Sequence, residues 1–435
     1  MSDDRFTLPL ARRRELVETG ALDPHAYRRD LVEHIRDADP AVRAFVDWRP
    51  GDVAASGVPW APSVTYKDTI DVAGYPTRLG IRSGYRRYPR ASAEIARRLA
   101  AVGLGCAGKV ATTECALGSV KPSRNPRYPH VSPAGSSTGS AVAVAAGFCD
   151  LSVGTDSGGS LRWPAVYCGV TSLRVTPRPE LLAGVHTVAP SLESVGFVAR
   201  TAADLAWCWR TYGLGAVVGA RAVRPSGRLR VAVTRPPGET LHPEVGALLD
   251  RVRDALAGSH HAVTEADLPE VWRLRAPAGE LLAREAHDSF AELAADPGVE
   301  LGPDTRAAID RGTAVTDPRY RWLRALQADA RVRLALLLRR AYDLLIMPLE
   351  ADLPDSADAR PASTLPEPGG GAMTLVANLA GLPVLAQPLA MSTQDSPLGV
   401  QVLAAPGADD LLVAAAELLA GLDLPVLAGS PETGR

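Results

Sequence analysis

Lysine is almost absent from this chain. Of its 47 basic residues, only Lys67, Lys109 and Lys121 are lysines, and the others are arginines. Such a bias fits a GC-rich genome. Because arginine keeps its proton near neutral pH whereas a desolvated lysine can lose it, proton transfer is one reason for a lysine to persist in such a sequence.

The cysteine and histidine patterns exclude the usual metal and disulfide frameworks. The five cysteines include no C-x-x-C pair and are odd in number, and none of the eight histidines lies in an H-E-x-x-H motif. This spacing argues for a reducing compartment and against structural disulfides or zinc. Three cysteines lie among apolar residues and are expected to be small buried side chains: Cys106, Cys149 and Cys168.

The chain also lacks the features of membrane and nucleic-acid partners. No run approaches the roughly 20 apolar residues that span a bilayer, and residues 1–5 (MSDDR) lack the basic-then-apolar order of a signal peptide. The formal net charge of -2 gives no global attraction to nucleic acid. With 46% hydrophobic residues among 435, we expect a cytoplasmic protein with a substantial core.

Two clusters of glycine and serine stand out against this background. They are residues 135–140 (GSSTGS) and residues 154–160 (GTDSGGS), with a short apolar segment between them. Glycine allows the backbone to approach a ligand closely, and successive N–H groups in such turns can converge on an anion. Ser160, at the end of a Gly-Gly turn, is therefore well placed as a nucleophile that supplies part of its own oxyanion hole.

Other uses of glycine and serine fit these clusters less well. Residues 135–139 match the G-x-S-x-G nucleophile elbow, with Ser137 as nucleophile, but a proline-rich loop at 121–130 precedes them instead of the required strand. Neither cluster has the spacing of a phosphate-binding loop. Tight turns without chemistry remain the alternative, and they explain one cluster more readily than two.

Three long motifs together resemble the amidase signature family. They are residues 66–74 (YKDTIDVAG), 134–140 (AGSSTGS) and 154–162 (GTDSGGSLR), and shorter likenesses occur at 377–383 (ANLAGLP) and 399–401 (GVQ). The likeness extends from about residue 30 to about residue 420. It implies an α/β fold, with one domain over residues 1–435, in which a central mixed sheet is flanked by helices on both faces. A variable helical segment is expected at 214–342.

The resemblance also implies a Ser–Ser–Lys triad. Ser160 would be the nucleophile, and Ser136 would be a bridging serine that follows a cis peptide bond from Gly135. Lys67 would be the general base that acts through the Ser136 hydroxyl. The oxyanion hole would be formed by the backbone N–H groups of Ser157, Gly158, Gly159 and Ser160, and neither a metal nor an organic cofactor would be needed.

These roles place physical demands on Lys67. A lysine must be neutral to accept a proton, so its pKa has to fall well below the usual value of about 10.4. Burial in a dry pocket produces shifts of that size. We therefore predict that Lys67 is buried with few acidic neighbours at hydrogen-bonding distance. The adjacent Asp68 is expected to point away or to pair elsewhere, with Arg162 and other arginines as candidate partners.

The function predicted is hydrolysis of a non-peptide carboxylic amide, with a small-molecule amide as substrate. Three alternatives remain: the amidase component of a tRNA-dependent amidotransferase, an amide synthase that transfers the acyl group to an amine, and an inactive binding relative. The intact triad positions argue against the last. Against the first, residues 175–180 (VTPRPE) depart from the Lys-Pro-Thr-Tyr-Gly-Arg pattern that such components keep. No nucleic-acid or membrane partner is expected, and a homodimer is left open.

The expected secondary structure alternates between strands and helices after a helical start. Residues 355–371 are rich in Pro, Gly, Ser and Asp and are expected to form a surface loop, either a lid or a plain connector. Strands are expected at 63–66, 105–110, 149–154, 229–234 and 344–348. Helices are expected at 23–37, 92–102, 138–147, 278–295, 320–342 and 411–422.

Overall fold

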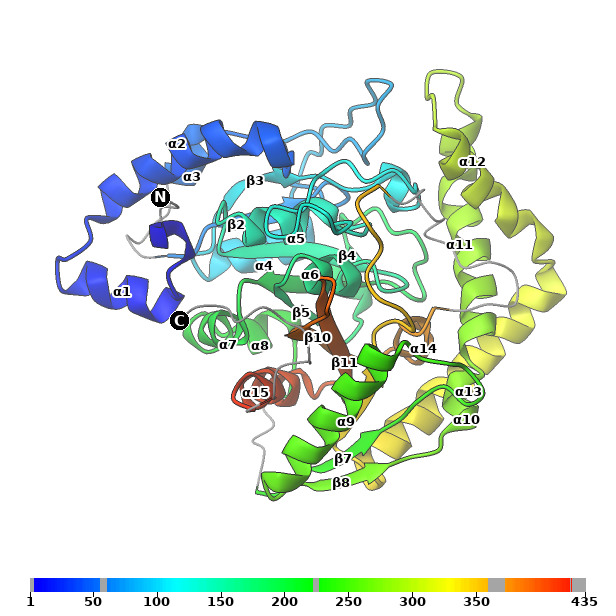
Figure 1. Cartoon of the computed structure of the whole chain (residues 1–435). Helices are drawn as coiled ribbons and strands as arrows, with labels where there is room; N and C mark the ends of the chain where they lie inside the picture. The colour runs from blue at the N-terminus through cyan, green and yellow to red at the C-terminus, as the bar shows by residue number, and fades with distance from the viewer. Residues whose placement is uncertain (1–3, 55–60, 222–226, 359–371, 423, 425–435) are drawn as a thin grey trace.

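A single large sheet runs through the molecule (Figure 1). The computed structural model describes residues 4–54, 61–221, 227–358, 372–422 and 424. Within that part of the chain the sheet has eleven strands. In spatial order they are β1 (Phe45–Trp48), β3 (Cys106–Val110), β2 (Val64–Lys67), β4 (Leu151–Asp156), β6 (Ser194–Ala199), β5 (Thr171–Arg174), β10 (Val384–Met391), β11 (Pro397–Leu403), β9 (Leu344–Pro348), β7 (Arg230–Val233) and β8 (Ala262–Glu265).

The strand pairing is mixed, as predicted. β2 is parallel to both β3 and β4, and β7 is parallel to both β9 and β8. The strands from β4 through β6, β5, β10 and β11 to β9 pair antiparallel, as do β1 and β3. Because β2 and β4 are adjacent and parallel, their carboxyl ends lie at the same edge of the sheet. Lys67 ends β2 and the second Gly/Ser cluster ends β4, so this topology brings the two motifs together.

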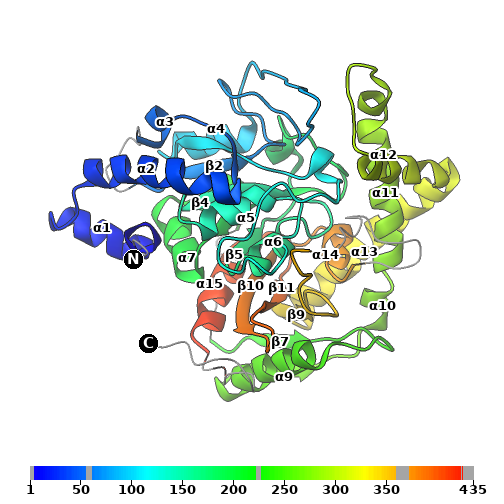
Figure 2. The same ribbon diagram turned by 45° about the horizontal axis from the view of Figure 1, so that its top comes forward.

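Helices cover both faces of the sheet (Figures 1 and 2). Figures 1 and 2 both show α1 and α2 at one side of the molecule and α11 to α13 at the opposite side. The α-helices are α1 (Leu10–Glu18), α2 (Pro24–Val42), α3 (Pro50–Ala54), α4 (Glu94–Ala101), α5 (Thr138–Ala145), α6 (Arg162–Tyr167), α7 (Ala202–Thr211), α8 (Leu214–Val218), α9 (Pro243–Gly258), α10 (Pro269–Trp272), α11 (Arg275–Ala295), α12 (Pro303–Asp310), α13 (Asp317–Arg340), α14 (Leu375–Ala380) and α15 (Asp409–Ala420). Short 3-10 helices occur at η1 (Asp4–Thr7), η2 (Glu114–Ala116), η3 (Pro179–Leu182) and η4 (Arg311–Ala314).

Side chains along one strand alternate between two apolar cores. In β9, Leu344 and Ile346 pack in a cluster with residues of α7, α9 and α15, whereas Leu345 and Met347 pack in another with residues of α11, α13 and α14. Successive side chains of a strand point to opposite faces. Both faces of the sheet are therefore buried, which confirms the predicted layered α/β fold.

A third cluster packs the N-terminal helices against α5, the helix that follows the first Gly/Ser cluster. Leu31 and Ile35 of α2 lie in this cluster with Val142 of α5 and with Phe148. Every residue of α5 is buried, so the helix has no polar face, as expected of a helix enclosed on all sides. The start of this helix, at the first Gly/Ser cluster, is thereby held inside the protein.

The sequence-based boundaries need small corrections. The signal at Asp23 and Pro24 does begin a helix, because the Asp23 side chain accepts a hydrogen bond from His25 N, but α2 continues to Val42. Val102 does not lie on the buried face of α4: it follows the last turn and is 36% exposed. Cys106 is only partly buried, because it begins a strand close to the sheet edge.

Two further expectations, the surface loop at 355–371 and the lack of a membrane-spanning segment, can be compared only with the described residues. Of the predicted surface loop 355–371, residues 359–371 lie outside the described residues, while Ser356 pairs with Val131 in an antiparallel bridge. In the described ranges, none of the helices combines the length and the apolar character that crossing a membrane requires.

Candidate active site

Lys67 lies at the carboxyl end of β2 and is fully buried. Its Nζ donates to Ser136 Oγ at 2.8 Å and to Thr155 Oγ1 at 2.9 Å. Thr155 belongs to β4, the strand beside β2. Among the described residues no carboxylate lies within ion-pair distance of this amine, so its direct partners are hydroxyl groups, as the sequence analysis predicted.

This environment brings the neutral form of Lys67 within reach near neutral pH, although the charged form still predominates at pH 7. Burial lowers the pKa of Lys67 to about 8, while the charges of Glu193 and Asp156, which lie farther away, act in the opposite direction. At pH 7 about a tenth of such amines are unprotonated, compared with roughly one in two thousand for an exposed lysine. Less free energy is therefore needed to reach the neutral, proton-accepting form of Lys67 than for an exposed lysine.

Ser136 follows a cis peptide bond from Gly135, which confirms the geometry implied by the family resemblance. The loop leaves no room for a side chain at Gly135: a Cβ there would lie 2.9 Å from Thr113 Cγ2 and 3.4 Å from Lys121 Nζ. Ser136 itself is fully buried. Its hydroxyl thus faces Lys67 from a tightly enclosed backbone.

The structure rejects Ser137 as an elbow nucleophile. Ser137 is buried, and its hydroxyl donates to the carbonyl oxygen of Thr155 at 3.0 Å. Its backbone N–H donates to the carbonyl oxygen of Ser160 at 2.9 Å, which ties the two Gly/Ser clusters together. Ser137 therefore has a structural role, and the exposed hydroxyl of an elbow is not present.

Ser160 is the partly exposed residue of a buried turn. Gly158 and Gly159 before it are buried, and Gly159 has a φ of +121°. A Cβ on Gly159 would lie 2.6 Å from Thr374 Oγ1. The turn therefore requires glycine both for its backbone conformation and for the close approach of Thr374.

The backbone N–H groups predicted to form the oxyanion hole differ in whether they already have a hydrogen-bond partner. The N–H of Gly159 donates to Asp156 Oδ1 at 2.9 Å and so is already occupied in this conformation. The N–H groups of Ser157, Gly158 and Ser160 make no hydrogen bond with other residues that the structure describes. These three N–H groups remain available as hydrogen-bond donors to a ligand. Gly159 contributes the positive φ that the turn requires.

A buried ion pair between Asp156 and Arg162 holds the turn in place. The Arg162 guanidinium donates to both oxygens of Asp156 at 2.9 Å, and both side chains are fully buried. Arg162 also donates to Gln401 Oε1 at 2.7 Å, and Asn378 donates to Asp156 Oδ1 at 2.8 Å. Although burial alone would raise it, the charge of Arg162 holds the pKa of Asp156 well below its usual range. The two C-terminal motifs, which contain Asn378 and Gln401, thus act by fixing the turn.

Asp68 does pair elsewhere, as predicted, but its cationic partner is Lys109 and not the side chain of Arg162 or of another described arginine. Its Oδ1 accepts a hydrogen bond from Lys109 Nζ at 3.1 Å, and its Oδ2 accepts one from the Arg78 backbone at 3.1 Å. Arg162 is committed to Asp156 instead. Because Lys109 lies on β3 beside β2, the parallel pairing brings it next to Asp68.

Sequence reasoning missed Glu193, which no motif marked. Glu193 is buried and directly precedes β6 in the sequence. Its Oε2 accepts hydrogen bonds from the Ser157 hydroxyl and, at 2.9 Å, from Val188 N. Burial raises the pKa of Glu193, and the charge of Lys67 lowers it. Thr155 was also missed, although it lies inside a quoted motif, because its contact with Lys67 depends on strand pairing.

The sequence profile described as Amidase matches residues 54–413. The chain belongs to the amidase signature family. Indoleacetamide hydrolase of Pseudomonas savastanoi is 39% identical over 201 residues, which cover 45% of this chain and 43% of that enzyme. The A component of the glutamyl-tRNA(Gln) amidotransferase of Deinococcus radiodurans is 30% identical over 418 residues, or 84% of this chain and 83% of that protein.

Solved structures of similar proteins lead to the same family. A 6-aminohexanoate cyclic dimer hydrolase complexed with substrate has a TM-score of 0.80 and 25% identity, covering 98% of this chain and 99% of that one. A structure described as an amidase has a TM-score of 0.79 and 27% identity, covering 95% and 100%. The predicted family, fold class and enzyme class of this amidase-family chain are therefore confirmed.

Proposed function

We propose that this amidase-family enzyme hydrolyses a small carboxylic amide through an acyl-enzyme on Ser160. The observation that carries the proposal is the buried Lys67 amine, which donates to the Ser136 and Thr155 hydroxyls and, among the described residues, has no carboxylate beside it. A buried lysine with a lowered pKa that faces hydroxyl groups is arranged as a general base.

Acylation would proceed as a proton relay. Neutral Lys67 takes the proton of the Ser136 hydroxyl, Ser136 takes that of Ser160, and Ser160 Oγ attacks the carbonyl carbon of the amide. The N–H groups of Ser157, Gly158 and Ser160 stabilise the negative charge that develops on the carbonyl oxygen. The relay then returns the proton through Ser136 to the amide nitrogen, the C–N bond breaks, and the amine leaves.

Deacylation would use the same groups in reverse. The relay accepts a proton from water, the resulting oxygen attacks the ester carbon, and Ser160 recovers its proton as the acid leaves. Besides the amide substrate, these steps consume one water molecule, and the proton transfers are carried by side chains of this chain. The hydroxyl of Thr155 and the charge of Glu193 act on the base rather than on the substrate.

A second candidate is the amidase component of a tRNA-dependent amidotransferase. The 30% identity to the Deinococcus amidotransferase protein over 84% of this chain favours it. The departure of residues 175–180 (VTPRPE) from the pattern of such components favours a stand-alone amidase. An amide synthase would use the same acyl-enzyme with an amine in place of water.

The purified chain should be labelled by a fluorophosphonate probe at Ser160 and should release acid and amine from simple amides. Mass spectrometry of the labelled peptide identifies the serine, and product analysis with added hydroxylamine measures transfer against hydrolysis. Stoichiometric labelling of another serine contradicts the proposal. Acid release without any partner protein supports the stand-alone enzyme, whereas hydroxamate as the main product at low hydroxylamine supports the synthase.

The rate of acylation should rise with pH and level off above about 8, the pKa of Lys67. Only the neutral amine accepts a proton, so below that pH the rate should fall about tenfold per unit. The measurement is kcat/KM for a neutral aryl amide from about pH 6 to 9.5. A flat profile over this range contradicts the assignment of Lys67 as the base.

Two other groups titrate in the same range and supply the controls. Burial lowers the pKa of Lys121 to about 8, and burial together with the charge of Asp355 raises the pKa of Glu350 to about 8. The variants Lys121→Met and Glu350→Gln should keep the same midpoint. If either variant moves the midpoint, that residue and not Lys67 controls the profile.

A further inference from the structure

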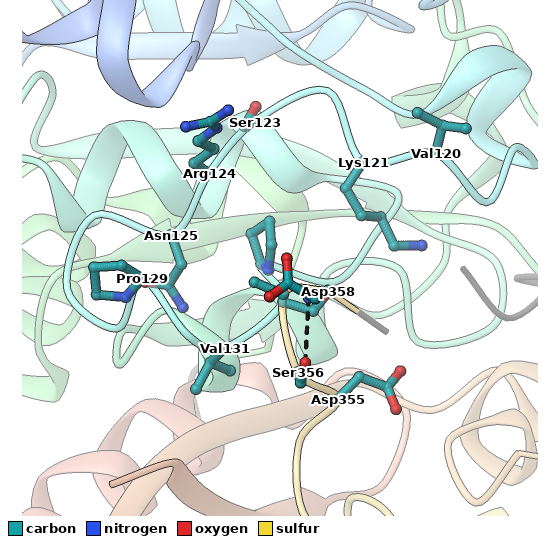
Figure 3. Close-up of a pocket in the computed structure, with 13 residues that line it drawn as sticks. Val120, Lys121, Ser123, Arg124, Asn125, Pro129, Val131, Asp355, Ser356 and Asp358 are labelled. Atoms are coloured by element: carbon teal, nitrogen blue, oxygen red, sulfur yellow. Dashed lines mark hydrogen bonds between the residues drawn. The ribbon is translucent and has the colours of Figure 1, made fainter. Parts of the chain in front are cut away.

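A polar cavity of about 480 Å³ lies beside the loop that leads to the first Gly/Ser cluster (Figure 3). Figure 3 shows Lys121 reaching down from the loop above the cavity, with Asp355, Ser356 and Asp358 on the opposite side. The two walls are joined by hydrogen bonds: Ser132 N donates to the Asp355 carbonyl oxygen at 2.8 Å, and Val131 pairs with Ser356. The cavity is therefore built from ordered backbone on both sides.

Lys121 is a partly buried cation of this cavity without a hydrogen-bond partner among the described residues. Its side chain is half-buried and makes no hydrogen bond or ion pair within the described part of the chain, although Lys67 and Lys109 both have close partners. Burial lowers the pKa of Lys121 to about 8, while Asp355 acts in the opposite direction, so the amine still carries its charge at neutral pH. A charged group that has lost water without gaining a partner favours an anionic ligand.

The position of Lys121 indicates which part of a substrate it would meet. Its Nζ lies 3.4 Å, and its Cδ 3.6 Å, from the point where a Cβ of Gly135 would be. Gly135 directly precedes Ser136, which in the proposed mechanism returns a proton to the departing nitrogen. In that mechanism the amine half of the substrate would lie near Ser136, and the Lys121 amine lies beside the residue that precedes Ser136.

We propose that this cavity holds the leaving amine of the substrate and that Lys121 pairs with a carboxylate on it, so that the preferred substrates are N-acylated amino acids. The inference rests on the proposed amidase function and adds the class of substrate. Arg124, also in the lining, adds a positive charge at the exposed rim. Asp355 and Asp358 are exposed as well, so solvent screens the repulsion between them and a bound carboxylate. Lys121 lies deeper, beside the loop of the first Gly/Ser cluster.

The test compares three amides of matched size in the wild type and in Lys121→Met. One carries a carboxylate on the amine half, one carries it on the acyl half, and one is neutral. The ratio of kcat/KM for the amine-side carboxylate to that for the neutral amide should fall about ten- to a hundredfold in the variant, mainly through KM, as expected for a lost charge-assisted hydrogen bond. An unchanged ratio, or a fall confined to the acyl-side carboxylate, overturns the inference.

Two controls separate this inference from the proposed function. Arg124→Met removes an exposed charge from the same lining and should change the ratio by no more than about threefold; a larger effect than that of Lys121→Met overturns the role of Lys121. The fluorophosphonate rate at Ser160 reports the catalytic groups independently of the amine. If the wild type is labelled and cleaves the neutral amide but Lys121→Met keeps the ratio, only the substrate class is wrong; if the wild type is not labelled at Ser160, the amidase mechanism itself fails.

Discussion

Ser160→Ala is expected to abolish amide turnover, with a loss in kcat of about 10⁴-fold or more, as when the nucleophile of a catalytic triad is removed. Without the Ser160 hydroxyl no acyl-enzyme forms, and Lys67 and Ser136 have no proton to relay. The measurement is kcat for the best amide of a panel, together with fluorophosphonate labelling, which should disappear. The fold should persist, because this hydroxyl makes no hydrogen bond with other described residues and the turn is held by its backbone and by Asp156.

The matched control is Ser137→Ala, in the neighbouring cluster. The Ser137 hydroxyl donates to the Thr155 carbonyl oxygen, so its loss should lower the melting temperature while labelling at Ser160 continues. Thermal unfolding and labelling together distinguish a catalytic role from a structural one. The assignment of Ser160 is wrong if the alanine variant at 160 retains more than about a hundredth of the activity while the variant at 137 is folded and inactive.

Lys67→Met should lower kcat by roughly 10³- to 10⁵-fold, since it removes the base while filling the buried space with an apolar chain of similar length. Lys67→Arg should not restore activity, because a guanidinium keeps its proton at any pH where the protein is folded. The measurement is the rate of acylation in a single turnover across pH. In both variants the alkaline rise of the profile should vanish.

Lys109→Met provides the comparison of one buried lysine with another. It leaves the Asp68 carboxylate buried without its cation, which typically costs about 3–5 kcal/mol of stability. We therefore expect a large fall in melting temperature, while the folded fraction keeps the pH midpoint of the wild type. Substantial activity in Lys67→Arg would contradict the assignment of Lys67 as the base. Loss of the pH midpoint in folded Lys109→Met would show that Lys109 controls the pH profile.

Local sequence was sufficient for the elements that depend on motif and periodicity. The Gly-Gly turn before Ser160, the strand that ends at Lys67 and the buried helix that begins at Thr138 follow from residue type and spacing, and the family resemblance supplied the cis bond before Ser136. These features are set within short stretches of chain. They account for the position of the candidate triad at one edge of the sheet.

The contacts that the sequence analysis did not predict depend on strand pairing, on side-chain conformation or on segments that lie far apart in the chain. Whether Asp68 pairs with Lys109 or with Arg162 depends on which strand lies beside β2, and no local pattern contains that information. The occupied N–H of Gly159 depends on the side-chain conformation of Asp156, three residues earlier. The environment of the Lys121 amine depends on the opposite wall of a cavity, whose residues follow much later in the chain.

The contacts of Arg162 have a consequence for how the protein folds during synthesis. Lys67, Ser136 and Ser160 are all translated early, yet Arg162, which holds the turn before Ser160 through Asp156, is itself bound by Asn378 and Gln401 near the end of the chain. A nascent polypeptide therefore carries the three candidate catalytic side chains long before the segments that hold the Ser160 turn have been made. If the proposed mechanism holds, we expect the nascent chain to become active only after the segments with Asn378 and Gln401 have been synthesised and have folded.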